Sequence, residues 1–178
     1  MDELVVLCTE DGKEKGTARK GEVHTASTPL HFAFSAWLFD DAGNVLLTRR
    51  ALNKLTWPGV WTNSFCGHPG PGETFEEALV RRASEELGTT VKNIESVLPE
   101  FRYRAVDASG IVENEICPVF FAELDGELNP NSDEVCEYEW VSLEDLKEVV
   151  KSFPFIFSPW LVEELEPVSY THLRAHET

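Results

Sequence analysis

The sequence predicts one mixed α/β domain of the α+β type, in which helices pack against a largely antiparallel sheet. Two patterns carry this prediction. Short apolar runs recur along the chain and are separated by Gly, Pro, Asn and Asp, as expected for strands joined by turns. The segment 74–88 instead has the features of a capped helix. With 178 residues and 42% hydrophobic content, the chain is long enough to bury one core.

The apolar runs locate the expected strands. The first covers residues 4–8 and precedes a polar turn, and we expect a second short strand over residues 15–24. Residues 30–39, which read LHFAFSAWLF, lead through an Asp/Gly/Asn turn into residues 45–47, and this pattern predicts a central hairpin. Three later strands are expected over residues 97–104, 113–124 and 138–141.

The clearest helix is bounded by recognisable caps. Thr74 is a candidate N-cap with Glu77 three residues further on, which makes a capping box, and Gly88 is placed to end the helix after Leu87. Later helices are expected over residues 143–151 and from Pro159 onward. Because no repeat or linker divides the chain, we expect a single domain over residues 1–167.

The last eleven residues form a separate case. Residues 168–178 read VSYTHLRAHET and resemble the translation of a sequencing adapter. We therefore predict that this tail is a non-native addition. An ordinary disordered terminus is the alternative. An intact gene that encodes the same tail would contradict the prediction.

The charge balance limits the classes of partner. Lys and Arg number 15 against 32 for Asp and Glu, which gives a formal net charge of −17. A surface that negative repels nucleic acids and anionic membranes, so we expect neither as a partner. A small phosphorylated substrate is still compatible if metal ions and a few local cations reverse the field inside one pocket.

Cysteine usage and the N-terminal segment indicate the compartment. The four cysteines, Cys8, Cys66, Cys117 and Cys136, have no paired CxxC spacing, as expected for free thiols in a reducing cytosol. The sequence begins without a basic leader, and no run approaches the roughly 20 apolar residues of a membrane-spanning helix. We therefore expect a cytoplasmic protein.

The loop GHPGPGE (67–73) precedes the predicted helix, which carries Arg81, Glu85 and Glu86 and ends at Gly88. This arrangement resembles the Nudix box: a glycine, a glutamate six residues on, and then Arg-Glu-x-x-Glu-Glu-x-Gly. The resemblance implies a Nudix-like α/β/α sandwich with a mixed, largely antiparallel β-sheet.

The resemblance departs from the hydrolytic pattern at two positions. Arg82 stands where Nudix hydrolases usually carry glutamate, and Thr89 stands where an aliphatic residue is expected. Arg82 and Glu86 are four residues apart and share a helix face, so one can contact phosphate while the other holds a divalent cation. A solvated acidic helix face with Arg partners explains the helix alone equally well.

Three features outside the helix are rarer. Residues 62–69, TNSFCGHP, resemble the TNSxCxHP motif of type I isopentenyl-diphosphate isomerases. Residues 109–115, SGIVENE, resemble the second signature of that family, and Tyr103 precedes it as the family expects. Trp160 matches an aromatic position of the family. The matching segments extend from about residue 5 to residue 160.

Histidines and paired glutamates predict a metal site. Glu113 and Glu115 are two apart on a predicted strand, so both carboxylates lie on one face. There they can meet His24, His31 and His68 around one ion, in a mixed N/O shell suited to Mn²⁺, Zn²⁺ or Mg²⁺. Each histidine alone is more commonly a structural residue. The paired glutamates favour the metal site.

The family resemblance also implies catalytic residues. Cys66 and Glu115 would flank the substrate from opposite faces, with Tyr103 hydrogen-bonded to Glu115 and the ring of Trp160 against developing positive charge. A packed core tryptophan and a small buried cysteine are the alternatives for Trp160 and Cys66. An ordinary thiol has a pKa of about 8.5, so we expect Cys66 to exchange protons without a large shift.

By the same resemblance, cations and a second ion would hold the diphosphate. The expected residues are Lys20, Arg50, Lys54 and Arg82, with Mg²⁺ bound between Glu86 and the substrate phosphates. The ion would neutralise and orient the diphosphate, while the carboxylate cluster needed to activate water is incomplete at Arg82.

The resemblance implies an isomerase that interconverts isopentenyl diphosphate and dimethylallyl diphosphate, a small-molecule diphosphate enzyme that we expect to be a monomer. The alternative is a Nudix pyrophosphohydrolase that acts on a nucleoside or other diphosphate. A third class is a non-catalytic metal-binding or nucleotide-binding module on the same fold. The isomerase and the hydrolase differ at position 82 and in their need for Cys66.

Overall fold

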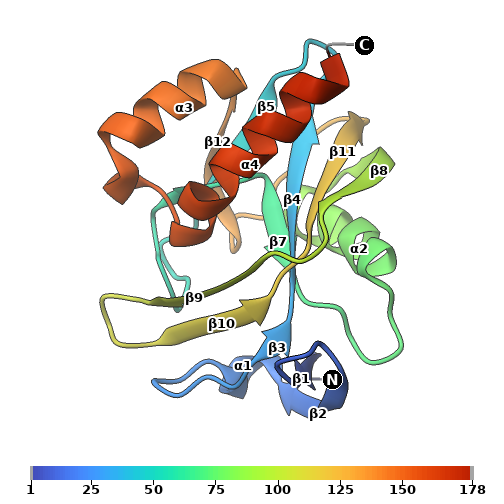
Figure 1. Cartoon of the computed structure of the whole chain (residues 1–178), viewed down its shortest axis with the longest axis vertical. Helices are drawn as coiled ribbons and strands as arrows, with labels where there is room; N and C mark the ends of the chain where they lie inside the picture. Colours follow the sequence, from blue (N-terminus) through green and yellow to red (C-terminus); the bar gives the residue numbers. More distant parts are fainter. Residues whose placement is uncertain (1, 177–178) are drawn as a thin grey trace.

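The computed structural model describes residues 2–176, and Figure 1 shows that two sheets and their helices make up this range. The smaller sheet has the strand order β2-β1-β3-β10-β9. Its neighbours are antiparallel except for β3 and β10, which run parallel. Its strands are β1 (Leu4–Cys8), β2 (Glu14–Arg19), β3 (His31–Phe32), β9 (Arg102–Val106) and β10 (Val112–Ile116).

The larger sheet has the order β12-β5-β4-β11-β8, and the short strands β6 and β7 pair with β5 and β4. Only β4 and β11 run parallel among its pairs within residues 2–176. Its strands are β4 (Phe34–Phe39), β5 (Val45–Arg50), β6 (Trp61–Thr62), β7 (Phe65–Gly67), β8 (Thr90–Leu98), β11 (Val119–Asp125) and β12 (Val135–Val141).

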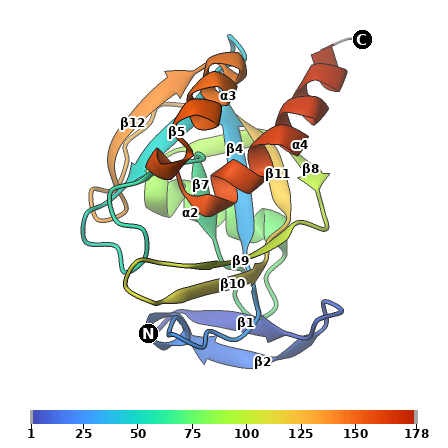
Figure 2. The same ribbon diagram turned by 60° about the vertical axis from the view of Figure 1, so that its left-hand side comes forward.

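Helices cover both faces of the larger sheet, as Figures 1 and 2 show. Helix α2 (Phe75–Leu87) packs on one face, and α3 (Leu143–Ser152) and α4 (Pro159–His176) pack on the other. A four-residue helix, α1 (Lys20–Val23), follows β2, and a 3-10 helix, η1 (Pro154–Ile156), joins α3 to α4. The predicted α/β/α sandwich is therefore confirmed.

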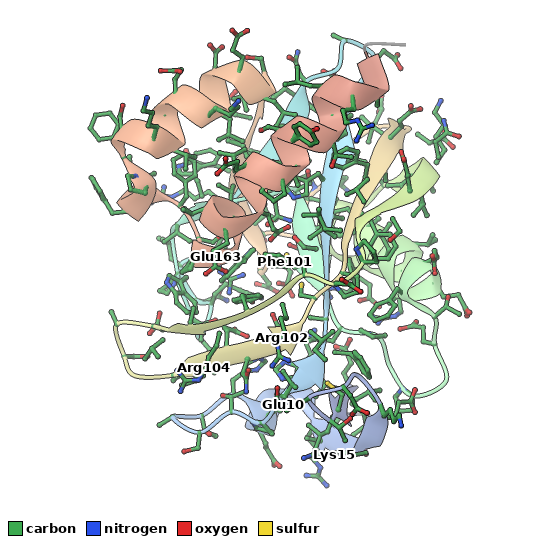
Figure 3. The ribbon with its side chains drawn as sticks, in the orientation of Figure 1. Glu10, Lys15, Phe101, Arg102, Arg104 and Glu163 are labelled. Atoms are coloured by element: carbon green, nitrogen blue, oxygen red, sulfur yellow. The ribbon has the colours of Figure 1, made fainter. Side chains whose placement is uncertain are left out.

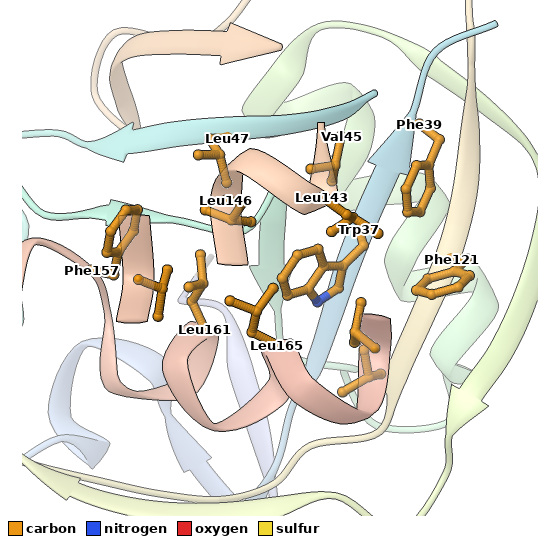
Figure 4. Packing of buried hydrophobic residues seen from close by; sticks show 13 residues of the cluster. Trp37, Phe39, Val45, Leu47, Phe121, Leu143, Leu146, Phe157, Leu161 and Leu165 are labelled. Atoms are coloured by element: carbon orange, nitrogen blue, oxygen red, sulfur yellow. The ribbon is translucent and has the colours of Figure 1, made fainter. Parts of the chain in front are cut away.

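The continuous apolar run of residues 30–39 is explained by this double cover. Side chains alternate between the faces of a strand. Phe34, Ala36 and Leu38 of β4 pack toward α2, whereas Trp37 and Phe39 pack toward α3 and α4. Figure 4 shows the second group against leucines of the two helices. A strand that is covered on both sides requires apolar residues at successive positions.

The caps of α2 follow the predicted pattern. The Thr74 side chain accepts a hydrogen bond from the Glu77 backbone N–H at 3.1 Å. Gly88 ends the helix in the left-handed conformation, with φ of 60°. A β-carbon at Gly88 would lie 2.3 Å from the backbone oxygen of Asn129, so glycine is required both by the conformation and by the close approach.

Two predicted strands were wrong in their extent. The strand predicted over residues 15–24 ends at Arg19, because residues 20–23 turn into α1. The strand predicted over residues 97–104 belongs to two elements: β8 begins at Thr90 and ends at Leu98, and β9 begins at Arg102. The two elements pair in different sheets, so the chain must bend between them.

The predicted strand over residues 113–124 was also wrong, because it is broken at Cys117-Pro118. Proline has no N–H for a sheet ladder and restricts the residue before it. The chain leaves the smaller sheet after Ile116 and enters the larger sheet at Val119. Because of this break, β10 lies in the smaller sheet and β11 lies in the core of the larger sheet.

An exposed contact also links the N-terminal hairpin to β9. Figure 3 labels Arg102 on β9 and Glu10 at the β1–β2 turn, and their side chains form an ion pair at 2.9 Å. Both side chains are largely exposed to solvent, so the pair contributes little to stability. Cohesion between β1, β3 and β10 rests on backbone pairing.

The tail predicted to be non-native is partly helical in the structure. Residues 168–176 continue α4, Val168 is fully buried in the core, and the ring of His172 stacks on Phe39 with centroids 5.0 Å apart. Residues 177–178 lie outside the described range. The tail thus contributes packing whatever its origin, and its non-native origin stays a prediction.

One carboxyl group lies in the core between α4 and β4. Glu164 is fully buried, and its Oε1 accepts a hydrogen bond from the Trp37 indole N–H at 3.1 Å. Its Oε2 has no hydrogen-bond partner among the described residues. Burial raises the pKa of Glu164 to about 8. The side chain is therefore mainly protonated at neutral pH.

We expect Glu164→Gln to stabilise the protein at pH 8 and to leave its stability nearly unchanged at pH 4.5. The folded-state pKa of about 8 lies above the ordinary carboxyl value of 4.5, so wild-type stability falls as the pH rises through this window. At about 1.4 kcal/mol per pKa unit, the difference reaches at most roughly 5 kcal/mol. Urea unfolding at several pH values measures it.

The exposed Glu166 on the same helix provides the control, since Glu166→Gln should reproduce the wild-type pH dependence. Parallel curves for wild type and Glu164→Gln would show that Glu164 is ionised in the folded protein.

Candidate active site

A cavity of about 430 Å³ opens where the smaller sheet meets β5, β7 and the start of α4. It collects nearly all the predicted site residues from distant parts of the chain. His31 alone among them is absent from the lining, because it is fully buried behind it. The lining includes Lys20, His24, Arg50, Lys54, Cys66, His68, Arg82, Glu86, Tyr103, Glu113, Glu115 and Trp160.

Strand register brings three of these residues together. Glu115 of β10 lies opposite His31 of β3 on one side and opposite Tyr103 of β9 on the other. Directly opposed residues in neighbouring strands place their side chains on the same face. Glu113 lies two positions earlier on β10 and so shares that face. The smaller sheet is thus the platform of the site.

Four side chains form a compact set of ligand atoms. Those of His24, His31, His68 and Glu115 all lie within 4.8 Å of one another. Glu115 Oε2 is 2.8 Å from His68 Nε2 and 3.1 Å from His31 Nε2. Glu113 adjoins this set, with its Oε2 at 3.0 Å from His24 Nε2. Three imidazoles and two carboxylates therefore converge on one region.

The hydrogen bonding of the histidines tests whether an ion fits there. The Nε2 atoms of His24 and His31 are buried and have no hydrogen-bond partner within residues 2–176, although carboxylate oxygens lie near them. His31 Nδ1 lies 2.9 Å from the carbonyl oxygen of Pro29, which accepts a hydrogen bond from Nδ1–H, so that Nε2 is the nitrogen able to bind an ion. This arrangement fits a divalent cation.

Charge in this cluster is held by its neighbours. Burial opposes ionisation of Glu115, but the adjacent His31 and His68 outweigh burial and hold its pKa well below the usual range. The Tyr103 hydroxyl donates a short hydrogen bond to Glu115 Oε1. Burial, with the charges of Glu115 and Glu113, raises the pKa of Tyr103, so the hydroxyl keeps its proton.

Cys66 lines the same cavity from β7. Its sulfur lies 3.5 Å from Asn63 Nδ2 and 3.6 Å from Ser35 Oγ. Burial, with a smaller effect from Glu164, raises the pKa of the Cys66 thiol well above its ordinary value. The expectation of a thiol with little shift was therefore wrong, because the cavity wall removes the solvent that would stabilise a thiolate.

Trp160 closes one wall of the cavity at the start of α4. It is 3% exposed and packs edge-to-face on Trp57, with ring centroids 5.5 Å apart. The Arg50 guanidinium carbon lies 5.3 Å from its ring centroid. The same guanidinium donates to the carbonyl oxygen of Thr56 at 2.8 Å. Arg50 therefore ties the loop after β5 to the aromatic wall.

Three of the four cations predicted to face a diphosphate already have acidic partners. Lys20 pairs with Glu3 at 3.1 Å, and Lys54 pairs with Glu134 at 2.6 Å. Arg82 contacts Glu86 at 2.9 Å. The pocket is therefore closer to neutral than the sequence suggested, and phosphate would have to replace carboxylate at some of these cations.

Three residues of the site were missed in the sequence. Glu134 lines the cavity and pairs with Lys54, but it lies in a polar loop without any motif. Asn63 belongs to the TNSFCGHP segment and makes the densest side-chain hydrogen bonding around Cys66, which motif matching does not indicate. Thr56 donates to Glu113 Oε1 at 2.9 Å and had no local signal.

Comparison with known proteins first identifies the class. The NUDIX domain model matches residues 29–161, which is more than half of the chain. A crystal structure from Deinococcus radiodurans aligns with a TM-score of 0.71 at 20% identity, covering 92% of this chain and 97% of that one. A MutT NUDIX hydrolase from Burkholderia pseudomallei aligns with a TM-score of 0.61 at 25% identity, covering 78% and 98%. These structures show the fold.

Closer relatives identify the family within this class. A protein of Clavibacter sepedonicus named isopentenyl-diphosphate Delta-isomerase is 56% identical over 174 residues, covering 98% of this chain and 91% of its own. One of the same name from Paenarthrobacter aurescens is 58% identical over 159 residues, covering 89% and 86%. The chain therefore belongs to the isopentenyl-diphosphate Delta-isomerase family and carries a NUDIX domain.

We expect the metal-free protein to bind a divalent cation at the His/Glu cluster, and His68→Ala to weaken that binding by at least about tenfold, because a ligand is lost. Calorimetric titration with Mn²⁺, Zn²⁺ and Mg²⁺ in separate experiments measures the affinity. His172→Ala is the matched control, since His172 lies on α4 against Phe39 and outside the cluster. Equal affinities for His68→Ala and wild type would place the ion elsewhere.

Proposed function

We propose that this protein interconverts isopentenyl diphosphate and dimethylallyl diphosphate. Its relatives at 52–58% identity carry the isomerase name. The observation that carries the proposal is the lining of one cavity by two groups able to exchange protons, the Cys66 thiol and the Glu115 carboxylate. A Nudix hydrolase has no need of a thiol in its phosphate site, and Arg82 replaces a carboxylate that hydrolysis uses.

The reaction itself requires such a pair. A proton must be added at one carbon of the olefin and another removed two carbons away, through a state with tertiary carbocation character. We propose that Cys66 and Glu115 serve as these two groups on opposite faces of the substrate. Tyr103 would act through its hydrogen bond to Glu115, which orients the carboxylate and adjusts its affinity for a proton.

The cavity wall supplies shelter for positive charge. Trp160 and Tyr103 are both buried, with ring centroids 5.7 Å apart. We propose that the face of Trp160 stabilises the carbocation-like state, an interaction of roughly 0.5 to 2 kcal/mol depending on desolvation. The position of the Arg50 guanidinium 5.3 Å from the ring centroid supports this role, because the ring already lies beside a cation.

Two ions complete the proposal. The first, Mn²⁺, Zn²⁺ or Mg²⁺, would be held by His24, His31, His68, Glu113 and Glu115, and when bound it would supply positive charge that keeps Glu115 in place. The second, Mg²⁺, would be held by Glu86 and the substrate phosphates. Lys20, Arg50, Lys54 and Arg82 would bind the diphosphate, and the present carboxylate partners of Lys20, Lys54 and Arg82 support an exchange of anions at those three side chains.

We propose a monomer as the working unit, because the candidate site is built from one chain. None of the helices in the described residues is both long and apolar enough to cross a membrane. A cytoplasmic location is supported by four free cysteines, and the net charge of −17 argues against nucleic acid or an anionic membrane as partner. We propose that residues 1–167 form the single isomerase domain.

We expect Cys66→Ala to reduce isomerase activity by at least about a thousandfold, because one of the two proton-exchanging groups is lost. NMR detection of dimethylallyl diphosphate, with Mg²⁺ and Mn²⁺ both supplied, measures the rate. Cys136→Ala is the matched control, since Cys136 is exposed and outside the cavity.

The hydrolase alternative gives a different result in the same experiment. A pyrophosphohydrolase would release phosphate from its substrate, and Cys66→Ala would leave that release almost unchanged. Failure of the wild-type protein to form dimethylallyl diphosphate with either metal would contradict the isomerase proposal.

A further inference from the structure

Asn63 is a fully buried amide between two parts of the candidate site, the Cys66 thiol and the Trp160 ring. Its Oδ1 accepts a hydrogen bond from the indole N–H of Trp160 at 3.1 Å. The sulfur of Cys66 lies 3.6 Å from the same oxygen and 3.5 Å from Asn63 Nδ2. One side chain therefore contacts both the thiol and the aromatic wall of the cavity.

The amide itself is held rigidly. Nδ2 lies 2.8 Å from Ser35 Oγ, 2.9 Å from the carbonyl oxygen of Ala36 and 3.2 Å from that of Phe65. Oδ1 also accepts from the hydroxyl of Thr62 at 2.9 Å. Since an amide has two N–H donors and one acceptor oxygen, this environment uses its full capacity and allows only one orientation of the oxygen and nitrogen.

Strand pairing explains why the amide reaches Cys66. In the β4–β7 pair, Ser35 lies opposite Cys66, and Asn63 lies in the two-residue connection between β6 and β7. The Ser35 hydroxyl contacts both Asn63 Nδ2 and the Cys66 sulfur. The sulfur therefore contacts the amide nitrogen and oxygen of Asn63 and the hydroxyl of Ser35, and these contacts restrict its position.

We infer that Asn63 is a positioning residue, which aligns the Cys66 thiol and the Trp160 ring toward the same substrate atoms through a single amide. The inference rests on the proposed isomerase function and deepens it. The Cys66 thiol and the Trp160 ring must both be aligned with one small substrate. Small displacements of either group from that alignment reduce the rate of catalysis. Linking both to one rigid amide keeps their relative position constant.

The decisive comparison is Asn63→Ala with Ser64→Ala. Ser64 is the adjacent, equally buried residue, and its hydroxyl bonds to the backbone of Leu38 and Leu46 without contact to Cys66 or Trp160. Both substitutions remove buried hydrogen bonds and should lower the melting temperature. Only Asn63→Ala should lower kcat, by roughly a hundredfold, with KM changed by less than about threefold, as expected for loss of alignment.

A second measurement does not depend on the substrate. The rate of Cys66 alkylation by iodoacetamide at one fixed pH, followed by mass spectrometry of the Cys66 peptide, should change by at least about fivefold in Asn63→Ala and stay constant in Ser64→Ala. All variants carry Cys136→Ser, because Cys136 is the exposed cysteine among the four. If Asn63→Ala does not fold, Ser35→Ala takes its place, since it removes one contact of both Asn63 and Cys66.

The substitution Trp160→Phe tests the coupling between Asn63 and the aromatic wall. It keeps an aromatic ring but removes the N–H that donates a hydrogen bond to Asn63 Oδ1. In a double-mutant cycle, the effects of Asn63→Ala and Trp160→Phe on kcat should be less than additive, because both break the same link. Fully additive effects, or equal kcat losses in Asn63→Ala and Ser64→Ala, would overturn the inference. An inactive wild type with the expected alkylation difference would instead reject the isomerase proposal and retain the positioning role.

Discussion

The site depends on the charge of one buried carboxylate, Glu115. It lies in the smaller sheet between His31 and Tyr103, and His68 reaches it from the segment after β7. A buried carboxylate is costly unless it is paired and hydrogen-bonded, and these neighbours supply both. Within residues 2–176, the buried Nε2 atoms of His24 and His31 in this cluster have no hydrogen-bond partner, and a bound cation would satisfy them.

The break at Cys117-Pro118 makes this placement compatible with a stable core. One continuous strand would have buried Glu113 and Glu115 in the larger sheet among apolar side chains. Instead β10 carries the charges in the smaller sheet, and β11 carries Val119, Phe120 and Phe121 into the core. Chemistry and stability are thus assigned to adjacent segments of the chain, separated by a residue that cannot donate to a ladder.

Positive side chains that line the cavity are paired with carboxylates of the same chain. An acidic chain of net charge −17 that acts on a diphosphate needs local cations, yet Lys54 and Arg82 are paired with Glu134 and Glu86. Such pairs hold long side chains in place before a phosphate arrives, at the cost of competing with it. The thiol side of the cavity is controlled differently, by burial and by the neutral amide of Asn63.

The sequence alone determined the fold class and the caps of α2, and it predicted most of the residues that line the candidate site, because these follow from local patterns and ordered motifs. Thr74, Gly88 and the residues around Cys66 could be recognised from their immediate neighbours. Only the tertiary structure decided where the chain passes from one sheet to the other, that Glu134 pairs with Lys54, and that burial raises the pKa of the Cys66 thiol. Pairing across the sheets and exclusion of water depend on residues far apart in the chain, and no local pattern records them.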